Sequence, residues 1–156
     1  MKGSYRIIVQ NAKVRYDFEI RRNITIVKGN SATGKTTLVE LIREYYENGE
    51  ESGISLSCEK ACIVLVGRDW ENALAAKKEC IVFVDEGNRF VHTKEFAGII
   101  QKTDNYYVIV TREGLVNCHI VLRKFTEFVN LESMHQSNRY IMNFIVYMGI
   151  IHLHRK

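Results

Sequence analysis

The stretch Gly29-Asn-Ser-Ala-Thr-Gly34-Lys35-Thr36 is a glycine-rich segment that ends in a lysine and a threonine. A β-branched run, Ile24–Val27, precedes it, and an amphipathic helical pattern begins at Thr36. This order predicts a strand, a tight loop and a helix, so that backbone N–H groups and the positive helix end point at one centre. Such a loop binds phosphate oxygens, and its glycines let the backbone turn around the anion. The sequence therefore predicts a phosphate-binding loop over Gly29–Thr37.

The side chains of this loop have expected roles toward a bound nucleoside triphosphate. Lys35 would place its ammonium on the β- and γ-phosphates, and Thr36 would give its hydroxyl to Mg²⁺. An ordinary turn before a helix would need neither a lysine nor two hydroxyls in this order. The backbone amides of residues 32–37 would surround the phosphates. The expected nucleotide-binding set is Gly29, Asn30, Ser31, Ala32, Thr33, Gly34, Lys35, Thr36 and Thr37.

Two adjacent acids follow an apolar run later in the chain. The run Cys80–Val84 is typical of a parallel strand that is covered by helices on both faces, and Asp85 and Glu86 come directly after it. Asp85 is expected to hold Mg²⁺ through water, and Glu86 to orient or deprotonate the water that attacks the γ-phosphate. Taken without the loop, the pair could also cap a helix or occupy a surface turn.

A third strand that ends in polar residues is a weaker signal. Tyr107–Val110 is followed by Thr111 and Arg112, either of which could contact the γ-phosphate. An arginine at this place could equally pair with Glu113 or Asp104 at the surface. Both interpretations of Arg112 stay open.

Strand and helix patterns alternate along most of the chain. Tyr5–Val9 and Val14–Ile20 are rich in β-branched and aromatic residues around a short turn, which predicts an antiparallel hairpin. Asp69 and Thr93 are expected to cap two later helices, with strands between and after them up to Tyr106–Val110. The alternation predicts an α/β fold with a mainly parallel central sheet.

The last part of the chain has the weakest pattern. Phe125–Val129 and Ile120–Leu122 could be strands, and the segment that begins at Asn138 could be helix or strand. Tyr140–Leu153 is apolar, yet it is shorter than the roughly 20 residues of a membrane-spanning helix, so we expect it in the core. We expect one domain over residues 1–156, in which the structure of residues 115–156 stays open between these alternatives.

Composition bounds the class of protein. The 156 residues are 46% hydrophobic and 26% charged, which is ordinary for a globular domain, and the net charge of +4 is spread among both signs. Charge therefore gives no support for nucleic-acid binding. The N-terminus has no apolar run of signal-peptide length, so a cytoplasmic location is expected. We expect reduced thiols and no zinc site at the four cysteines, Cys58, Cys62, Cys80 and Cys118.

Together these motifs resemble P-loop NTPases of the additional-strand, catalytic-glutamate class and, within it, the ABC-type ATPases. The resemblance covers about residues 4–113 and rests on the hairpin, GNSATGKTT, IVFVDE and YYVIVTRE. It implies a three-layer P-loop sandwich that binds ATP and Mg²⁺. The catalytic residues would then be Glu86, Lys35 and Arg112, and the metal ligands Thr36 and Asp85.

The sequence also departs from the ABC pattern. It has no LSGGQ-like signature, no helical insertion of the length that holds one, and no clear Q-loop glutamine. In ABC proteins the partner subunit's signature contacts the γ-phosphate, so this domain would need a homodimer or an unidentified protein partner, hydrolyse ATP slowly, or act mainly as a binding switch. ATP is favoured over GTP because no NKxD-type motif occurs, and Tyr5 or Tyr16 could stack on the base.

Three functions remain as hypotheses. The leading one is a Mg²⁺-dependent ATPase whose nucleotide state changes its shape or its partner affinity. A small-molecule or nucleotide kinase is the first alternative, although such kinases usually have an arginine-rich lid and Arg68, Arg89 and Arg112 are scattered singly. The second alternative is a non-hydrolysing nucleotide-binding module. A nucleic-acid surface at Tyr140, Phe144 and Tyr147 is not supported, because these aromatics lie in an apolar run.

Overall fold

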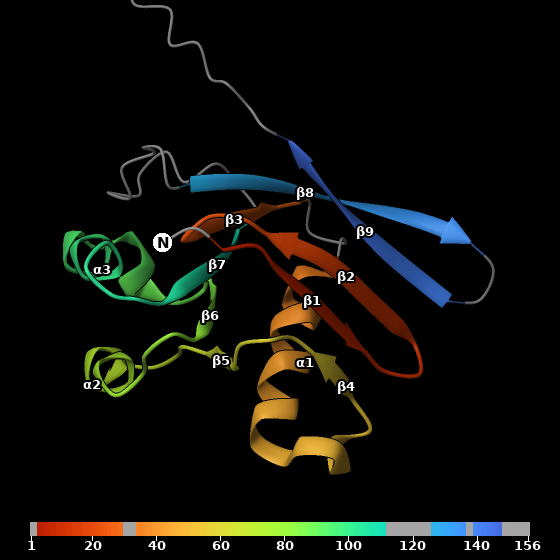
Figure 1. The fold of residues 1–156 in the computed structure, drawn as a ribbon, viewed down its shortest axis with the longest axis horizontal. Coiled ribbons are helices and arrows are strands. Elements are labelled where there is room, and N and C mark those ends of the chain that lie inside the picture. Colours follow the sequence, from red (N-terminus) through yellow and green to blue (C-terminus); the bar gives the residue numbers. More distant parts are fainter. Residues whose placement is uncertain (1–2, 30–33, 112–125, 137–138, 148–156) are drawn as a thin grey trace, which may run out of the picture.

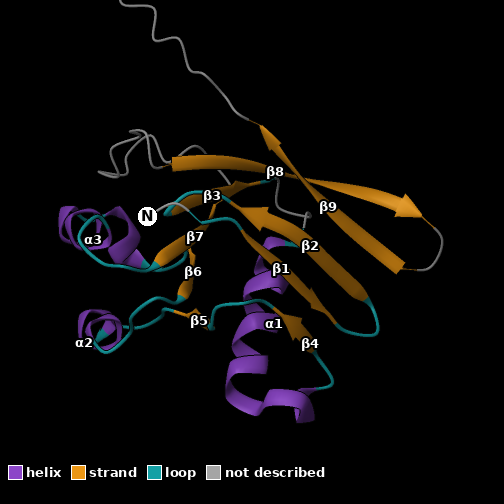
Figure 2. Ribbon diagram, in the orientation of Figure 1, coloured by secondary structure: helices purple, strands orange, loops and turns teal. Residues whose placement is uncertain are grey.

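The computed structural model describes residues 3–29, 34–111, 126–136 and 139–147, with the backbone alone described after residue 111. Its strands form one mixed sheet in the order β4-β1-β2-β9-β8-β3-β7-β6-β5, with helices packed against it (Figures 1 and 2). The elements, in chain order, are β1 (Tyr5–Gln10), β2 (Val14–Ile20), β3 (Ile24–Lys28), α1 (Lys35–Asn48), η1 (Gly49–Ser52), β4 (Ser55–Ser57), β5 (Cys62–Val64), α2 (Trp70–Ala75), β6 (Ile81–Asp85), η2 (Arg89–His92), α3 (Lys94–Ile100), β7 (Tyr106–Thr111), β8 (Thr126–Gln136) and β9 (Arg139–Tyr147).

One half of the sheet is parallel. Strands β5, β6, β7 and β3 pair side by side in the same direction, and β8 continues this direction beyond β3. Strand β7 lies between β3 and β6, although it follows both in the chain. Because the strands are parallel, their carboxyl ends meet at one edge, where Lys28 is in register with Thr111 and Val110 with Asp85. The two motif-bearing strands, β3 and β6, therefore end at the same edge.

Helices cover both faces of this parallel part. Alternate side chains of β6 take opposite faces: Ile81 and Phe83 pack in a cluster with α1, while Val82 and Val84 pack in a second cluster with α2, η2 and α3. All four side chains are fully buried, which contributes about 1.5–3 kcal/mol each. The prediction of an α/β fold with a set of parallel strands is confirmed, and β6 is covered by helices on both faces. The three-layer P-loop sandwich stays a prediction.

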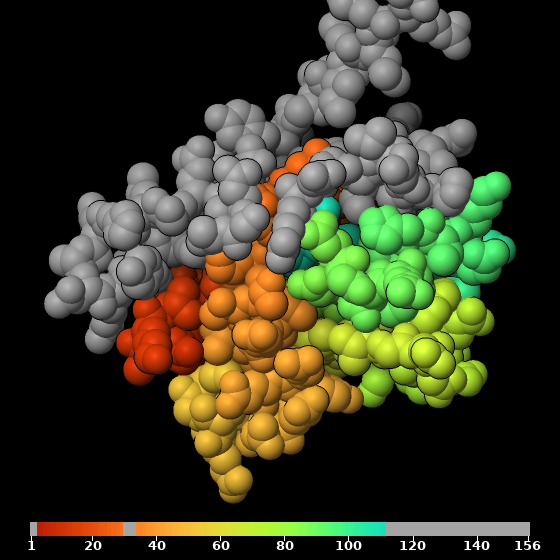
Figure 3. Space-filling model, turned by 180° about the vertical axis from the view of Figure 1, so that it is seen from behind, coloured from red at the N-terminus to blue at the C-terminus, as the bar shows by residue number. Residues whose placement is uncertain are grey.

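The other half of the sheet contains the predicted hairpin. Strands β1 and β2 pair antiparallel from Tyr5↔Ile20 to Gln10↔Arg15, and β4 adds to the outer edge of β1. The turn forms because the Asn11 side-chain oxygen accepts hydrogen bonds from the backbone N–H groups of Lys13 and Val14, at 2.8 and 2.9 Å. In the space-filling view from behind, α1 lies between the red hairpin and the green second half of the chain (Figure 3).

Helix α1 follows the predicted pattern. Leu38, Leu41 and Ile42 are buried against the sheet, whereas Glu40 and its neighbours on the opposite face are exposed. The helix ends before Gly49, which has a φ of 59° and donates its N–H to the carbonyl of Tyr45. The glycine thus ends the helix at Asn48.

The two predicted helix caps had different outcomes. The Thr93 hydroxyl accepts a hydrogen bond from the Phe96 N–H at 3.2 Å and caps α3, as predicted. Asp69 occupies the N-cap position of α2, as predicted, but its side chain does not act as a cap. Its carboxylate accepts from the Asn72 side-chain amide at 2.5 Å and makes no hydrogen bond to the backbone of α2. With φ −92° and ψ 29°, Asp69 also lies outside the extended conformation that an N-cap residue normally adopts.

The later part of the chain is β structure where it is described. Strand β9 decides the helix-or-strand alternative beyond Asn138 in favour of strand, and β8 replaces and extends the predicted Phe125–Val129. Ile120–Leu122 lies outside the described residues. Two short strands lie in the central region: β4 pairs with β1, and β5 pairs with β6. Among the described helices, none has both the length and the apolar character needed to cross a membrane.

Candidate functional site

The junction between β3 and α1 has the backbone geometry of a tight loop that opens a helix. Gly34 is the N-cap residue of α1, with φ 81° and ψ 16°, a left-handed conformation that glycine adopts without strain. The first turn of α1 contains no acidic residue, so its own side chains do not offset the positive end of the helix dipole. Asn30, Ser31, Ala32 and Thr33 lie outside the described residues, and their predicted contacts stay predictions.

The lysine of the loop is folded inward. Lys35 is only 6% exposed, and its ammonium donates a hydrogen bond to the backbone carbonyl of Gly29, the residue just after β3. This contact brings the two ends of the loop together through the lysine side chain. The Lys35 ammonium therefore lies at the junction between β3 and α1.

The two threonines of the first helical turn are both exposed at the surface. Thr36 is therefore open to solvent, and its predicted role as a magnesium ligand stays a prediction. Thr37 neighbours the hydroxyl of Tyr16 on β2; burial raises the pKa of this hydroxyl, and Thr37 lowers it by less.

The acidic strand end is shaped by a turn. One carboxylate oxygen of Asp85 accepts a hydrogen bond from the Gly87 N–H at 2.8 Å. The Asp85 carbonyl accepts from Asn88 twice, from its backbone N–H at 3.1 Å and its side-chain amide at 3.0 Å. A Cβ on Gly87 would come within 3.3 Å of the Asp85 carboxylate, so a small residue is favoured here. These contacts fix the Asp85 side chain at the edge of the sheet.

Glu86 is held by the neighbouring strand. The Thr111 hydroxyl, on β7, donates a hydrogen bond to a Glu86 carboxylate oxygen at 2.6 Å, and the Glu86 N–H donates to the Val110 carbonyl at 3.0 Å. Thr111 is only 2% exposed. Of the two residues predicted for the third motif, the structure brings Thr111 to the acid pair, whereas Arg112 lies outside the described residues. The Glu86–Thr111 contact was missed, because only the strand order makes β6 and β7 neighbours.

The three motifs lie along one row of strand ends. Strand β7 separates β3 from β6, and neighbouring strands lie about 4.8 Å apart, so the backbone of Lys28 is about 10 Å from that of Asp85. A ligand held at the β3–α1 loop can therefore also meet side chains at the end of β6. Ligand sites of open α/β sheets lie at this carboxyl edge.

The predicted base-stacking role of Tyr16 is wrong. Its side chain is fully buried and belongs to the cluster around α1, together with Phe18 and Ile20, which share its face of β2. Tyr5 packs edge-on against Tyr106, with ring centroids 4.9 Å apart. The stacking of Tyr5 on a base stays a prediction.

The thiols fit the prediction where they are described. Cys58, Cys62 and Cys80 are free, and Cys118 lies outside the described residues. A hydrogen bond with the Cys62 thiol lowers the pKa of Cys58 to about 7. Within the described part of the chain, no group of three or more His, Cys, Asp and Glu side chains could hold a metal ion. This is compatible with the expected Mg²⁺ site, which uses a single carboxylate beside a threonine.

Neither a protein-family model nor a curated protein matches the chain. Function must therefore be inferred from the arrangement of residues. That arrangement places a left-handed glycine, a buried lysine and an exposed threonine at the start of a helix. Across one intervening strand lie two adjacent carboxylates, one of them bonded to a buried threonine.

Proposed function

We propose that this protein binds ATP with Mg²⁺ at the β3–α1 loop and hydrolyses it, and that its nucleotide state controls its shape or a partner. The observation that carries the proposal is the shared edge at which β3, β7 and β6 end, with the loop at one side and Asp85 and Glu86 at the other. The position of β7 between the two motif strands supports membership of the additional-strand class of P-loop NTPases.

The loop supplies the binding end of the site. Backbone N–H groups of the first turn of α1, beginning at Lys35, would donate to phosphate oxygens at the positive end of the helix. The Lys35 ammonium would exchange the neutral Gly29 carbonyl for negatively charged phosphate oxygens, a stronger charge-assisted contact. This exchange needs only a change of rotamer, because the lysine already lies across the loop.

Thr36 and Asp85 fit a magnesium ion that arrives with the nucleotide. Mg²⁺ keeps several waters and takes phosphate oxygens as ligands, so few protein groups are required. Thr36 is exposed at the start of α1, and Asp85 is half-buried at the end of β6. When bound, the ion would supply charge neutralisation on the phosphates; Asp85 would hold its water ligands, and Thr36 would contact it directly.

Glu86 is the proposed general base. Its carboxylate is oriented by the Thr111 hydroxyl at 2.6 Å, so it stands at the edge next to the expected γ-phosphate rather than sampling many rotamers. A carboxylate in this place would orient an attacking water and accept its proton. Arg112 follows Thr111 directly in the chain and remains the proposed contact to the γ-phosphate.

A pair of glutamate variants tests the proposal. Glu86→Gln keeps the size of the side chain and its ability to accept from Thr111 but removes the base, so phosphate release should fall about 100-fold or more while ATP affinity stays within about twofold. The matched control is Glu44→Gln on the exposed face of α1, which should change neither quantity. Phosphate release is measured over a range of protein concentrations, so that a homodimer requirement appears as a rise in specific activity.

The outcomes separate the three functions. Phosphate release that is unchanged in Glu86→Gln would remove Glu86 from the mechanism. ATP binding without release of phosphate at any protein concentration would favour the non-hydrolysing module. Transfer of the γ-phosphate to a small acceptor instead of water would favour the kinase.

A further inference from the structure

A buried tyrosine of the hairpin reaches the phosphate-binding loop. Tyr16, on β2, is fully buried, and its hydroxyl donates a hydrogen bond to the Gly34 carbonyl at 2.7 Å. The same carbonyl accepts the first backbone bond of α1, from the Leu38 N–H at 3.0 Å. Two donors, one from the helix and one from a distant strand, therefore fix the carbonyl of the residue on which the loop ends.

The tyrosine hydroxyl is a permanent donor at this place. Burial raises the pKa of Tyr16 to about 12, so the hydroxyl keeps its proton throughout the neutral range. The neighbouring Thr37 side chain lowers the pKa of this hydroxyl by less than burial raises it. Tyr16 therefore remains a donor to the carbonyl of Gly34, the residue before α1.

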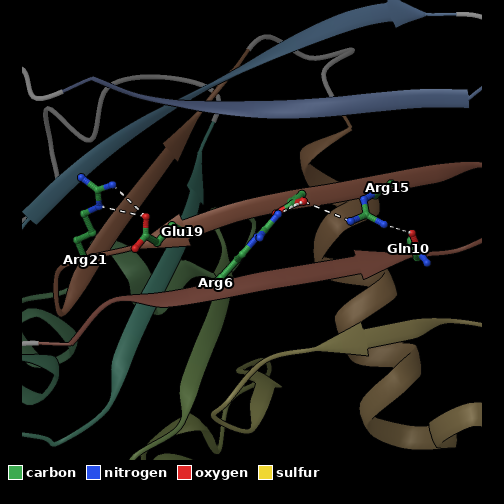
Figure 4. A network of polar contacts seen from close by, with 6 residues as sticks. Arg6, Gln10, Arg15, Glu19 and Arg21 are labelled. Atoms are coloured by element: carbon green, nitrogen blue, oxygen red, sulfur yellow. Dashed lines mark hydrogen bonds and ion pairs between the residues drawn. The ribbon is translucent and has the colours of Figure 1, made fainter.

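The strand that carries Tyr16 is itself held firmly. Its neighbours Arg15 and Asp17 point to the outer face of the hairpin, where Asp17 accepts two hydrogen bonds from Arg6, each at 2.8 Å, and Arg15 donates to Gln10 (Figure 4). On the inner face, the Tyr16 ring packs in the cluster that contains α1. The packing of the ring and the pairing of β2 with β1 limit the freedom of the hydroxyl, whereas the exposed ion pairs on the other face contribute little.

Gly34 is the residue whose conformation directs the loop into the helix. Its left-handed backbone, with φ 81°, sets the direction of the peptide units on either side. We propose that Tyr16 is a positioning residue that holds this end of the phosphate-binding loop in its binding conformation, and so links the hairpin to the nucleotide site. The role in nucleotide binding rests on the proposed function, whereas the role in ordering the loop does not.

The link predicts regulation in both directions. If β2 determines the position of the Gly34 carbonyl, a partner that shifts the hairpin changes the affinity for ATP. By thermodynamic reciprocity, bound ATP then changes the affinity for that partner by the same factor. The hairpin is therefore the element through which ATP binding would change the affinity for a partner.

The test compares two buried tyrosines. Tyr16→Phe removes the hydroxyl that reaches Gly34, and Tyr107→Phe removes an equally buried hydroxyl that bonds to Thr103 at 2.6 Å. In the nucleotide-free protein, exchange of the Leu38 amide should accelerate about tenfold in Tyr16→Phe and stay within about twofold in Tyr107→Phe. The thermal midpoint of both variants is measured alongside, so that a general loss of stability is recognised.

A second measurement uses ATP. The dissociation constant for Mg·ATP should rise about tenfold in Tyr16→Phe, with KM raised and kcat nearly unchanged, and Tyr107→Phe should bind like the wild type. If the wild type fails to bind ATP, the proposed function fails, and the exchange of Leu38 still decides the role of Tyr16. Equal exchange and equal affinity in the two variants would overturn the inference.

Discussion

The two edges of the parallel sheet use buried polar side chains in different ways. At the amino edge, Asn105 is 1% exposed; its side-chain oxygen accepts from the Cys80 N–H at 3.0 Å, and its amide donates to the Lys77 carbonyl at 3.0 Å. At the carboxyl edge, Thr111 is about as deeply buried, but its hydroxyl bonds to another side chain, that of Glu86.

We expect this difference to separate polar residues needed for folding from those needed for the proposed nucleotide binding. A side chain that completes backbone hydrogen bonds cannot move without leaving peptide groups unsatisfied, which costs about 1–3 kcal/mol for each group. A side chain that bonds another side chain can exchange its partner for a ligand while the backbone stays in place. Removing residues at the amino edge should therefore affect folding, and removing them at the carboxyl edge should affect binding.

Lys35→Ala gives the largest expected effect. Loss of the charged contacts to phosphate should weaken Mg·ATP binding by about 3–4 kcal/mol, which is several-hundredfold in the dissociation constant. The free energy of unfolding should change little or rise, because a largely buried cation is removed. Calorimetric titration measures the dissociation constant, and urea unfolding measures the free energy of unfolding. The control is Lys94→Ala, which changes an exposed lysine on α3. Undiminished affinity would defeat the phosphate-binding assignment.

Asn105→Ala should show the opposite profile. The Cys80 N–H and the Lys77 carbonyl lose their partner, so the free energy of unfolding should fall by about 2–3 kcal/mol. The affinity of the folded protein for Mg·ATP should stay within about twofold. The matched control, Asn72→Ala, breaks only an exposed bond to Asp69 and should cost less than about 1 kcal/mol. A large loss of affinity in Asn105→Ala would mean that the two edges are not independent.

The smallest expected effect concerns Cys58 and Cys62, near the amino edge. It is a pH dependence of the rate at which Cys58 is alkylated. Because the Cys62 thiol stabilises the Cys58 thiolate and lowers the pKa of Cys58 to about 7, alkylation of Cys58 should rise about tenfold from pH 6 to pH 8 and then level off. Replacement of Cys62 by alanine should slow alkylation at pH 7 about tenfold, since the pKa returns toward about 8.5. Mass spectrometry of the labelled peptides resolves each thiol. A rate that still climbs steeply above pH 8 would contradict the lowered pKa.

Much of the fold could be predicted because its signals are local. The burial of Leu38, Leu41 and Ile42 follows from helical spacing, and the strand before Asp85 follows from a short apolar run. The inward direction of the Tyr16 side chain also follows from the sequence, since alternation along the strand places it on the same face as Phe18 and Ile20. The expectation that Tyr16 could stack on a nucleotide base fails because aromatic character alone does not determine which face of the strand a side chain takes.

The rest depended on pairing between distant segments. The contact of Glu86 with Thr111 requires that β7 lie beside β6, and no spacing along the chain states that order. Competition between side chains is equally hard to predict from the sequence. Asp69 lies at the N-cap position of α2, yet its carboxylate accepts a hydrogen bond from the Asn72 side chain. The signals for β8 and β9 were weak along the chain, because each strand completes a sheet formed by much earlier residues.

The placement of β8 and β9 has a consequence for how the chain folds. Strands β2 and β3 are joined by a short connection, yet the late hairpin of β8 and β9 stands between them, with β9 on β2 and β8 on β3. Contacts between such distant segments form slowly, and unpaired strand edges attract strands from other chains. During synthesis, strand β3 must therefore remain without one of its two neighbours until the residues of β8 have emerged. Aggregation in that interval is the hazard that this topology carries.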